Sequence, residues 1–491
     1  MSEAGALASL GVIELAERVR TGEVSATEVA KSTLARIDAR DPELHAFLTV
    51  SRDEVLSQAR AVDEKRARGE ALGPLAGVPV ALKDALCTRG VRTTSGSKIL
   101  ERYVPPYDAT VVARLRAADA LLPGKTNMDE FAMGSSNENS AFGPTKNPWD
   151  TTRAPGGSSG GSAASVAARM TPGSLGSDTG GSIRQPAAFS GVVGVKPTYG
   201  RVSRYGLVAF ASSLDQIGPF ATDVRGASRI LSVIAGRDPR DATSLDAPVP
   251  DFEKACGASV KGLRIGVPEE YFGAGIDGEV AAHVRGAIAT LEREGCSVKP
   301  VKLAHTRFAV ATYYVLATAE ASSNLARFDG VRYGLRVEKE DLREMYGATR
   351  DAGFGPEVKR RILLGTFVLS AGYYDAYYLK AQKVRTLICR DFEEAFREVD
   401  VIAAPTAPTP AFKLGELVSD PLTMYLNDIT TLPASLAGLP SMSVPCGLTK
   451  GGLPIGLQLT TPLLTEERLF SIGAAWEALS PVRGAVPPRA S

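Results

Sequence analysis

Two glycine-rich serine clusters stand out as segments that could perform acyl transfer. The first is Gly156–Ser162 (Gly-Gly-Ser-Ser-Gly-Gly-Ser), and the second is Ser177–Ser182 (Ser-Asp-Thr-Gly-Gly-Ser). Glycine lets the backbone turn sharply and leaves its N–H groups unshielded, so such loops can build an oxyanion hole beside a serine nucleophile. An unassisted serine hydroxyl is a weak nucleophile, however, and it needs a base to accept its proton.

Lys83 is well placed to be that base. It follows Leu75–Leu82, a short continuous apolar run that predicts a buried strand. Burial disfavours the ammonium form, and a lysine pKa must fall by about 3 units from about 10.4 before the neutral amine can act near pH 7. Catalysis by a serine-histidine or cysteine-histidine pair is disfavoured, because the chain has only three histidines: His45, His283 and His305.

The elements around these loops indicate an α/β fold. Residues 262–267, 279–294 and 297–303 have the pattern of a strand, a helix and a strand, and an apolar strand at 401–404 follows another helix. Strands joined by crossing helices pair in parallel, with the helices on the faces of the sheet. Two further strands, 441–446 and 454–459, flank a Lys-Gly-Gly turn and predict an antiparallel hairpin.

A helical segment is predicted at the N-terminus, over about residues 1–70. Ser25 and Glu28 have the spacing of a capping box before a helix over about residues 26–39, which Asp41-Pro42 is expected to end. No break in composition marks a domain boundary, so residues 1–491 are predicted to form a single domain.

Composition and charge narrow the functional class. The 491 residues include 56 lysines and arginines against 55 aspartates and glutamates, a net charge of +1, so no global field attracts nucleic acid. If the protein serves RNA, a partner is expected to hold it. The five cysteines lie far apart, and no metal site is expected. Met1–Leu10 lacks the pattern of a secretory signal and no run of 18 apolar residues occurs, which predicts a cytoplasmic protein without a membrane span.

The lysine and the two serine clusters, in this order, resemble the amidase signature family, whose catalytic unit is Ser-Ser-Lys without histidine. The match is long in the serine region, where Gly156–Ser162 is followed by Gly176–Pro186 (Gly-Ser-Asp-Thr-Gly-Gly-Ser-Ile-Arg-Gln-Pro). The resemblance implies that Ser182 is the nucleophile, that Ser158 is a bridging serine on a cis peptide, and that Lys83 is the terminal base.

The same resemblance implies an oxyanion hole and a fold. The backbone N–H groups of Thr179, Gly180 and Gly181, with that of Ser182, would bind the oxyanion. The amidase signature fold is α/β, with a large mixed, mostly parallel twisted sheet covered by helices on both faces. Beside the loop, Asp178 and Arg184 have opposite charges, and we expect them to pair and brace it.

Further segments resemble the A subunits of the glutamyl-tRNA(Gln)/aspartyl-tRNA(Asn) amidotransferases. They are Gly124–Ser136, Ala319–Gly330, Gly365–Tyr378, Gln382–Thr386 and Tyr425–Asp428. This resemblance implies a subunit that hydrolyses glutamine and passes the ammonia to partner subunits B and C of a heterotrimer. The partners would hold the mischarged tRNA and use ATP and magnesium, while this chain would need no cofactor.

Free glutamine carries an α-carboxylate and an α-ammonium, so its pocket needs one cation and one anion beyond the scissile amide. Arg361 and Asp428 match the family positions that bind these groups, and Tyr313 matches the position that contributes a hydroxyl. Arg360 directly precedes Arg361, so a register shift of one residue would exchange the two arginines.

Two alternatives remain open: a free-standing amidase that acts on a small amide, and an inactive scaffold. The complete triad argues against the scaffold, and the predicted charge pair argues against an apolar amide. Ala85 stands where the family commonly has asparagine, and Thr94–Ser97 where it commonly has Thr-Cys-Ala-Ser, which puts the hydrogen bonding near Lys83 in question. The choice between glutamate- and aspartate-charged tRNA is made outside this chain.

Overall fold

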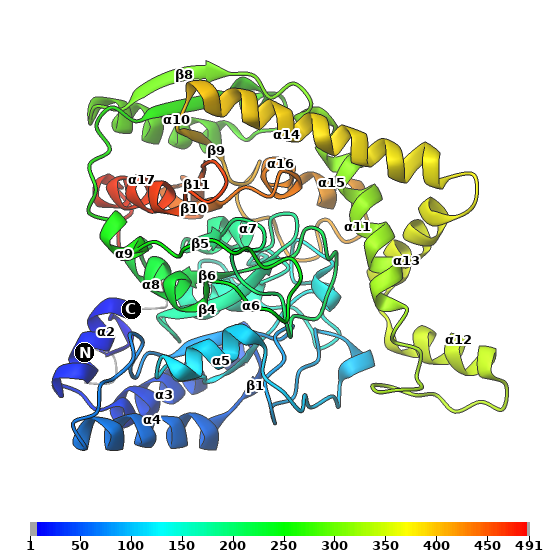
Figure 1. Ribbon diagram of the computed structural model, residues 1–491, viewed down its shortest axis with the longest axis horizontal. Coiled ribbons are helices and arrows are strands. Elements are labelled where there is room, and N and C mark those ends of the chain that lie inside the picture. Colours follow the sequence, from blue (N-terminus) through cyan, green and yellow to red (C-terminus); the bar gives the residue numbers. More distant parts are fainter. Residues whose placement is uncertain (1–6, 489–491) are drawn as a thin grey trace.

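One mixed sheet contains every strand of residues 7–488, the part of the chain that the computed structural model describes (Figure 1). From edge to edge its order is β1 (Phe47–Val50), β3 (Gly124–Thr126), β2 (Val80–Lys83), β4 (Gly173–Asp178), β6 (Gln216–Ala221), β5 (Val193–Lys196), β10 (Ser441–Leu448), β11 (Pro454–Thr460), β9 (Val401–Pro405), β7 (Arg264–Pro268) and β8 (Ser297–Val301). Strands from the two halves of the chain therefore meet in its centre.

The α/β fold with a large mixed sheet is confirmed, but the expected majority of parallel pairs is wrong. Four neighbouring pairs are parallel: β2–β3, β2–β4, β7–β8 and β7–β9. Six are antiparallel: β1–β3, β4–β6, β5–β6, β5–β10, β10–β11 and β9–β11. The predicted hairpin is β10–β11, and β5 and β6 follow each other without a crossing helix, so neither connection enforces parallel pairing.

Helices cover both faces of the sheet. They are α2 (Val12–Thr21), α3 (Ala26–Leu44), α4 (Arg52–Ala67), α5 (Thr110–Ala117), α6 (Gly160–Ala167), α7 (Arg184–Ser190), α8 (Val224–Ile234), α9 (Phe252–Ala255), α10 (Gly278–Arg293), α11 (Ala309–Leu325), α12 (Leu342–Gly353), α13 (Pro356–Leu369), α14 (Lys380–Glu398), α15 (Pro421–Leu426), α16 (Leu432–Leu436) and α17 (Glu466–Leu479). The predicted strand–helix–strand unit is β7–α10–β8, with its strands parallel.

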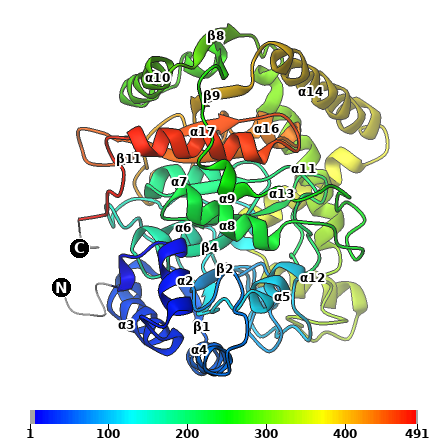
Figure 2. The same cartoon turned by 60° about the vertical axis from the view of Figure 1, so that its left-hand side comes forward.

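Strand β10 shows why α7 and α17 lie on opposite faces. Met442 approaches Gly473 of α17. The next residue, Ser443, lies on the other face, where it and Ala188 of α7 both approach Gly456 of β11. Because consecutive residues of a strand point to opposite faces, the two helices sandwich the sheet. Figure 2 shows α8, α9 and α17 gathered in front of the sheet.

The predicted N-terminal helical segment contains the helices α2, α3 and α4, but it is not wholly helical, because strand β1 (Phe47–Val50) lies within it. Residues 1–6 of the predicted range lie outside the described residues. The capping box of Ser25 and Glu28 starts α3 as expected. The expected end at Asp41-Pro42 is wrong, because α3 continues to Leu44. The Asp41 carbonyl accepts the N–H of His45, and the Asp41 carboxylate accepts the N–H of Ala46 at 2.7 Å, which caps the additional turn. The single-domain organisation of residues 1–491 stays a prediction.

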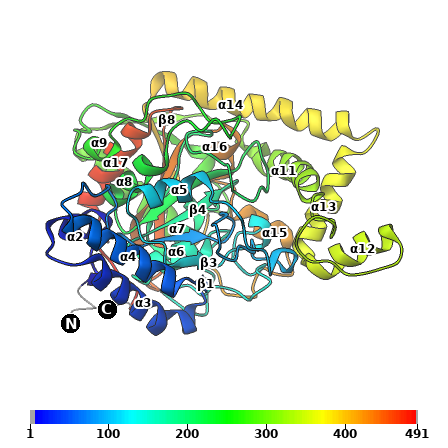
Figure 3. The ribbon, with the colours of Figure 1, turned by 60° about the horizontal axis from the view of Figure 1, so that its bottom comes forward.

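A second helical layer stands apart from the sheet. Helix α11 packs against α13 and α14, and α12 and α13 project to the right in Figures 1 and 3. None of the helices within residues 7–488 combines the length and apolar character needed to cross a bilayer.

Candidate active site

The predicted site residues come from elements far apart in the chain. Lys83 ends β2, Ser158 precedes α6, Thr179–Ser182 connects β4 to α7, Tyr313 lies on α11, Arg361 on α13, and Asp428 just after α15. Strands β2 and β4 are parallel neighbours, so their carboxyl ends meet at one edge of the sheet. This places Lys83 directly beside the end of β4.

Lys83 Nζ is surrounded by hydroxyl groups. It lies 2.7 Å from Ser158 Oγ and 2.9 Å from both Ser159 Oγ and Ser177 Oγ. A neutral amine has two N–H donors and one lone pair. Two of the hydroxyls can therefore accept its N–H groups while the third donates its proton to the lone pair. The geometry suits a lysine that acts as a base.

Burial shifts the acidity of this amine in the same direction. The Lys83 side chain is fully buried, and desolvation lowers its pKa to about 7. The carboxylates of Asp129, Asp178 and Asp215 act against that shift, because negative charge favours the ammonium. Near neutral pH both forms of the amine are therefore populated, as a proton shuttle requires.

Ser158 contacts Lys83, and the next residue, Ser159, contacts the Ser182 segment. The Gly157–Ser158 peptide bond is cis, as the family resemblance implied. The Ser159 N–H donates to the Ser182 carbonyl at 3.2 Å, which holds the two serine segments side by side. Among the described residues the Ser182 hydroxyl has no hydrogen-bond partner, and the residue is 7% exposed, so the hydroxyl remains available to a bound substrate.

The loop before α7 presents free backbone donors. Within residues 7–488, no acceptor is found for the backbone N–H groups of Thr179, Gly180, Gly181 or Ser182. The Thr179 hydroxyl donates to Asp215 Oδ1 at 2.7 Å and anchors the loop. Free N–H groups beside a serine hydroxyl are what an oxyanion hole requires.

The expected pairing of Asp178 with Arg184 is confirmed. The Arg184 Nε–Asp178 Oδ2 and Arg184 Nη2–Asp178 Oδ1 distances are both 3.0 Å, and both side chains are fully buried. Arg184 also donates to Thr431 O, Gln458 Oε1 and Ser435 Oγ. The pair thus ties the Ser182 loop to β11 and to the segment around α16.

Tyr313 and Asp428 both lie against this loop. A methyl group added at Gly180 would come within 2.9 Å of the Tyr313 hydroxyl, and one added at Gly181 would come within 3.0 Å of Asp428 Oδ1. The Ser135 hydroxyl donates to Asp428 Oδ2, whereas Asp428 Oδ1 is buried and has no hydrogen-bond partner among the described residues. Burial raises the pKa of Asp428 to about 7.

Arg361, and not Arg360, faces the interior. Both pair with Glu357, but the Arg361 side chain is 4% exposed and that of Arg360 is 49% exposed. The Arg361 guanidinium lies 5.1 Å from the ring centre of Tyr314 and 5.3 Å from that of Tyr425. Both arginines line a pocket of about 430 Å³ together with Tyr425. Burial therefore favours Arg361 over Arg360 as the cation of the pocket, and its role as a substrate ligand stays a prediction.

Several site residues were not identified from the sequence. Ser159 and Ser177 belong to the recognised clusters, but nothing in their spacing marks them as Lys83 partners. Ser135 lies in a recognised segment as well. Glu357, four residues before Arg361, has the spacing of a helical ion pair and could have been found. Asp129, whose carboxylate acts on the Lys83 ammonium, is brought near that residue only by the tertiary fold.

The substitution at Ala85 leaves the hydrogen bonds of Lys83 in place. Ala85 is buried, and its carbonyl accepts the N–H of Val208 at 2.9 Å. The Thr94 hydroxyl donates to Asp84, the residue that follows Lys83. The amine itself bonds to Ser158, Ser159 and Ser177 without any contribution from position 85.

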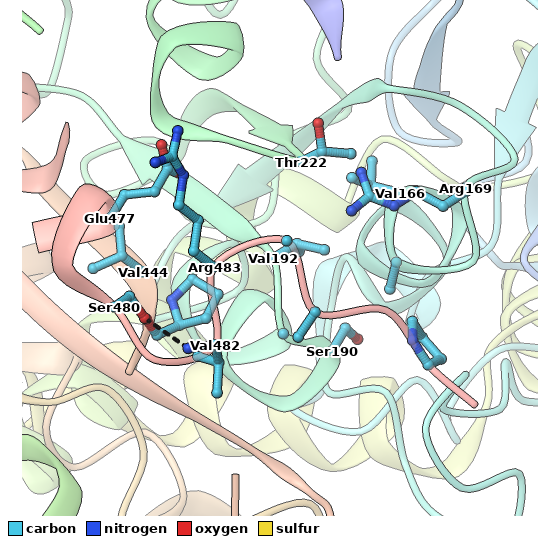
Figure 4. Close-up of a pocket in the computed structure, with 16 residues that line it drawn as sticks. Val166, Arg169, Ser190, Val192, Thr222, Val444, Glu477, Ser480, Val482 and Arg483 are labelled. Carbon is cyan, nitrogen blue, oxygen red and sulfur yellow. Dashed lines mark hydrogen bonds between the residues drawn. The ribbon is translucent and has the colours of Figure 1, made fainter. Parts of the chain in front are cut away.

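The other pockets have none of the predicted site residues in their lining. Figure 4 shows a small one of about 30 Å³ lined by Arg169, Glu477 and Arg483, and no predicted site residue borders it. A wider pocket of about 900 Å³ is lined by Asn427 and Ile429, the two neighbours of Asp428. Within residues 7–488, no three His, Cys, Asp or Glu side chains cluster as metal ligands.

Comparisons with known proteins show the family of the chain. The Amidase family profile matches residues 28–470. The A subunit of the glutamyl-tRNA(Gln) amidotransferase of Moorella thermoacetica is 61% identical over 464 residues, which cover 94% of this chain and 95% of that protein. Its counterpart in Koribacter versatilis is 60% identical and covers 94% and 96%. The crystal structure of the A subunit of the glutamyl-tRNA(Gln) amidotransferase from Thermotoga maritima superposes with a TM-score of 0.81 at 45% identity, covering 98% of this chain and 97% of that one. The chain belongs to the amidase family and, within it, to the A subunits of the glutamyl-tRNA(Gln) amidotransferases.

Proposed function

We propose that this chain hydrolyses glutamine to glutamate and ammonia, and that the ammonia is used by partner subunits to amidate mischarged tRNA. The relatives named above support the amidotransferase assignment. One observation carries the choice of glutamine: the buried, unpartnered carboxylate oxygen of Asp428 beside the Ser182 loop. An ammonium group is the complement that such an oxygen requires.

Catalysis begins with proton transfer away from the nucleophile. Ser182 Oγ attacks the side-chain carbonyl carbon of glutamine and gives its proton to Ser158 Oγ, which passes its own proton to neutral Lys83. The oxyanion of the tetrahedral intermediate accepts hydrogen bonds from the free N–H groups of the 179–182 loop. The 2.7 Å separation of Lys83 and Ser158 supports the second transfer.

The proton then returns to the leaving group. The Lys83 ammonium protonates the amide nitrogen through Ser158, the C–N bond breaks, and ammonia leaves an acyl ester on Ser182. Water attacks this ester and loses its proton along the same relay, and glutamate is released with the serine hydroxyl restored. Each proton taken by Lys83 is thus given back within the same half-reaction.

Three side chains would orient the substrate. Asp428 Oδ1 receives the α-ammonium, Arg361 binds the α-carboxylate, and the Tyr313 hydroxyl contacts the part of the substrate nearest Gly180. The two terminal nitrogens of Arg361 make no hydrogen bond to the described residues, so they are free to bind the carboxylate. A simple aliphatic amide would leave both charges without a ligand, which makes the free-standing amidase the weaker alternative.

The remaining chemistry is assigned to partners. We assign the tRNA, ATP and magnesium to subunits B and C of a cytoplasmic heterotrimer, and no cofactor to this chain. The net charge of +1 supports a division of labour in which another subunit holds the RNA. Because the relatives are named for glutamyl-tRNA(Gln), that tRNA is the first substrate to test, and aspartyl-tRNA(Asn) is the second.

The test measures ammonia release from glutamine and from butyramide by the isolated chain and by its complex with subunits B and C. We expect kcat/KM for glutamine to exceed that for butyramide by at least about 100-fold, because butyramide lacks both charged groups. The complex should also amidate Glu-tRNA(Gln) with glutamine and ATP. Equal or better turnover of butyramide, without any tRNA amidation, would establish the free-standing amidase instead.

A further inference from the structure

Several exposed apolar side chains lie on α13, on the connection that follows it and on the π-helical segment η5 (Tyr374–Leu379). Residues 370–377 are all exposed. The large members of this surface, exposed by 37–70%, are Leu363, Leu364, Phe367, Tyr373, Tyr374, Tyr377 and Leu379. We call these seven side chains the α13–η5 surface. Isolated exposed apolar residues are common, but a group of this size marks an interaction site.

The aromatic rings of this surface are already packed on one another. The Phe367 and Tyr373 ring centres are 4.4 Å apart, and the Tyr377 ring lies 5.9 Å from each of them. Ring stacking restricts the side chains before any partner binds, so less entropy is lost on association. The surface is therefore organised for contact although the described residues leave it uncovered.

A second group of exposed apolar residues lies across the Arg361 pocket. Val418, Leu422 and Leu426, on and before α15, are exposed by 62%, 74% and 46%. Residues of both α13 and the 417–425 segment line that pocket. Figures 1 and 3 show α15 close to α13 on this side of the molecule. We call these three residues the α15 group.

The combined area matches that of a protein interface. The ten side chains are exposed by half on average. A side chain of this size has an accessible area of roughly 150–250 Å², so together they present about 900 Å². The largest apolar patch of a typical monomer is about 300–600 Å², whereas a specific complex buries about 800 Å² on each partner.

We propose that the α13–η5 surface and the α15 group form the docking surface for the protein subunit that receives the ammonia. This inference rests on the proposed function, because ammonia released at Ser182 must reach a second catalytic site. The complementary face is apolar, with acidic groups at its edge to meet the exposed side chains of Arg360, Lys380 and Lys383.

The composition favours a protein over an RNA as the occupant. Six of the ten side chains are aliphatic: Leu363, Leu364, Leu379, Val418, Leu422 and Leu426. Nucleic-acid surfaces combine base-stacking aromatics with a dense array of cations, and aliphatic side chains contribute to neither. Since α13 also carries Arg361, a protein bound here would contact the helix that holds the glutamine carboxylate.

The test uses the full chain with Phe367→Asp and Tyr377→Asp combined, mixed with subunits B and C. We expect the dissociation constant of the complex to rise at least about 100-fold, since a buried charge replaces a central aromatic contact. Glutamine-dependent amidation should fall with assembly. The matched control is Leu463→Asp, which places the same charge at a residue 53% exposed on the loop between β11 and α17 and should assemble normally.

Further variants keep the result interpretable if the double variant loses its fold. Tyr377→Phe should assemble like the wild type, whereas Leu422→Asp, on the other side of the pocket, should weaken the complex. Wild-type affinity in the double variant and in Leu422→Asp would overturn the proposal. Loss of tRNA binding while the protein complex still assembles would also overturn it, in favour of RNA. If the wild-type complex itself lacks glutamine-dependent amidation, the proposed function fails instead.

Discussion

Lys83 Nζ lies 2.7 Å from Ser158 Oγ, and both residues are completely buried. The ammonium form of Lys83 is therefore deprived of water and depends on hydroxyl groups and on distant carboxylates for its stability. The pair connects a base with a pKa near neutrality to the loop of Ser182. The protonation state of this one amine should control the rate of the reaction.

The first prediction concerns that protonation state. Burial lowers the Lys83 pKa to about 7, and only the neutral amine can accept a proton. The kcat for glutamine should therefore fall about tenfold per pH unit below about pH 7 and level off above it, as steady-state assays across this range would reveal.

Lys83→Ala should lower turnover by orders of magnitude, and Lys83→Arg should fail equally, since a guanidinium does not give up its proton. Arginine-supported activity would contradict a neutral lysine base.

The second prediction separates the source of ammonia from its use. Ser182→Ala should lower glutamine hydrolysis by at least about 10⁴-fold, because the attacking oxygen is removed. The complex with subunits B and C should still amidate tRNA when free ammonium is supplied, since that reaction bypasses Ser182. Assays with each nitrogen donor test this. If the ammonium-dependent reaction also disappears, Ser182 has a structural role.

The third prediction uses two neighbouring arginines as a matched pair. Both contact Glu357, but only Arg361 is buried. A charged hydrogen bond contributes about 1.5–3 kcal/mol, so Arg361→Ala should raise the KM for glutamine about 10- to 150-fold. Arg360→Ala should leave it nearly unchanged, and butyramide turnover should be insensitive to both. Equal effects of the two substitutions on KM would show that Arg361 acts through Glu357 and not on the substrate.

The fourth prediction concerns Asp428. Burial raises its pKa to about 7, so the carboxyl group is protonated below that pH and charged above it. Because the α-ammonium of glutamine binds the charged form, the KM should rise as the pH falls below about 7. Asp428→Asn should raise the KM and remove this pH dependence, while the kcat profile set by Lys83 remains. A KM profile that is the same in the variant would exclude Asp428 as the ammonium ligand.

The fifth prediction addresses stability. Asp178→Asn leaves the buried Arg184 guanidinium without its carboxylate, and breaking a buried pair in this way costs about 3–5 kcal/mol. Thermal unfolding followed by fluorescence should show a melting temperature lowered by several degrees. The control is Asp150→Asn, which removes a partly exposed pair with Arg153 and should change the melting temperature very little. Similar melting temperatures for the two variants would mean that the Asp178–Arg184 pair does not brace the loop.

Local patterns in the sequence were enough to locate the reactive segments and part of the fold. Residue type and local spacing were enough to locate the serine clusters, the β7–α10–β8 unit and the β10–β11 hairpin. The strand predicted over Leu75–Leu82 is only partly correct, because β2 is limited to Val80–Lys83 and residues 74–77 form a turn. Hydrophobic periodicity and glycine positions report backbone conformation directly, because both act over neighbouring residues. The resemblance to a family then supplied the roles of residues too far apart for such reasoning.

Contacts between distant segments were decided only by the tertiary structure. Ser177, 94 residues from Lys83, joins its hydroxyl cluster because β2 and β4 are neighbours in the sheet. The orientation of α13 buries Arg361 and exposes Arg360, and the packing of the segment after α15 brings Asp428 against Gly181. The pKa of Lys83 and that of Asp428 follow from burial among side chains of other elements. Chain folding sets which strands pair and which charges lose water, and a pattern of local spacing carries neither kind of information.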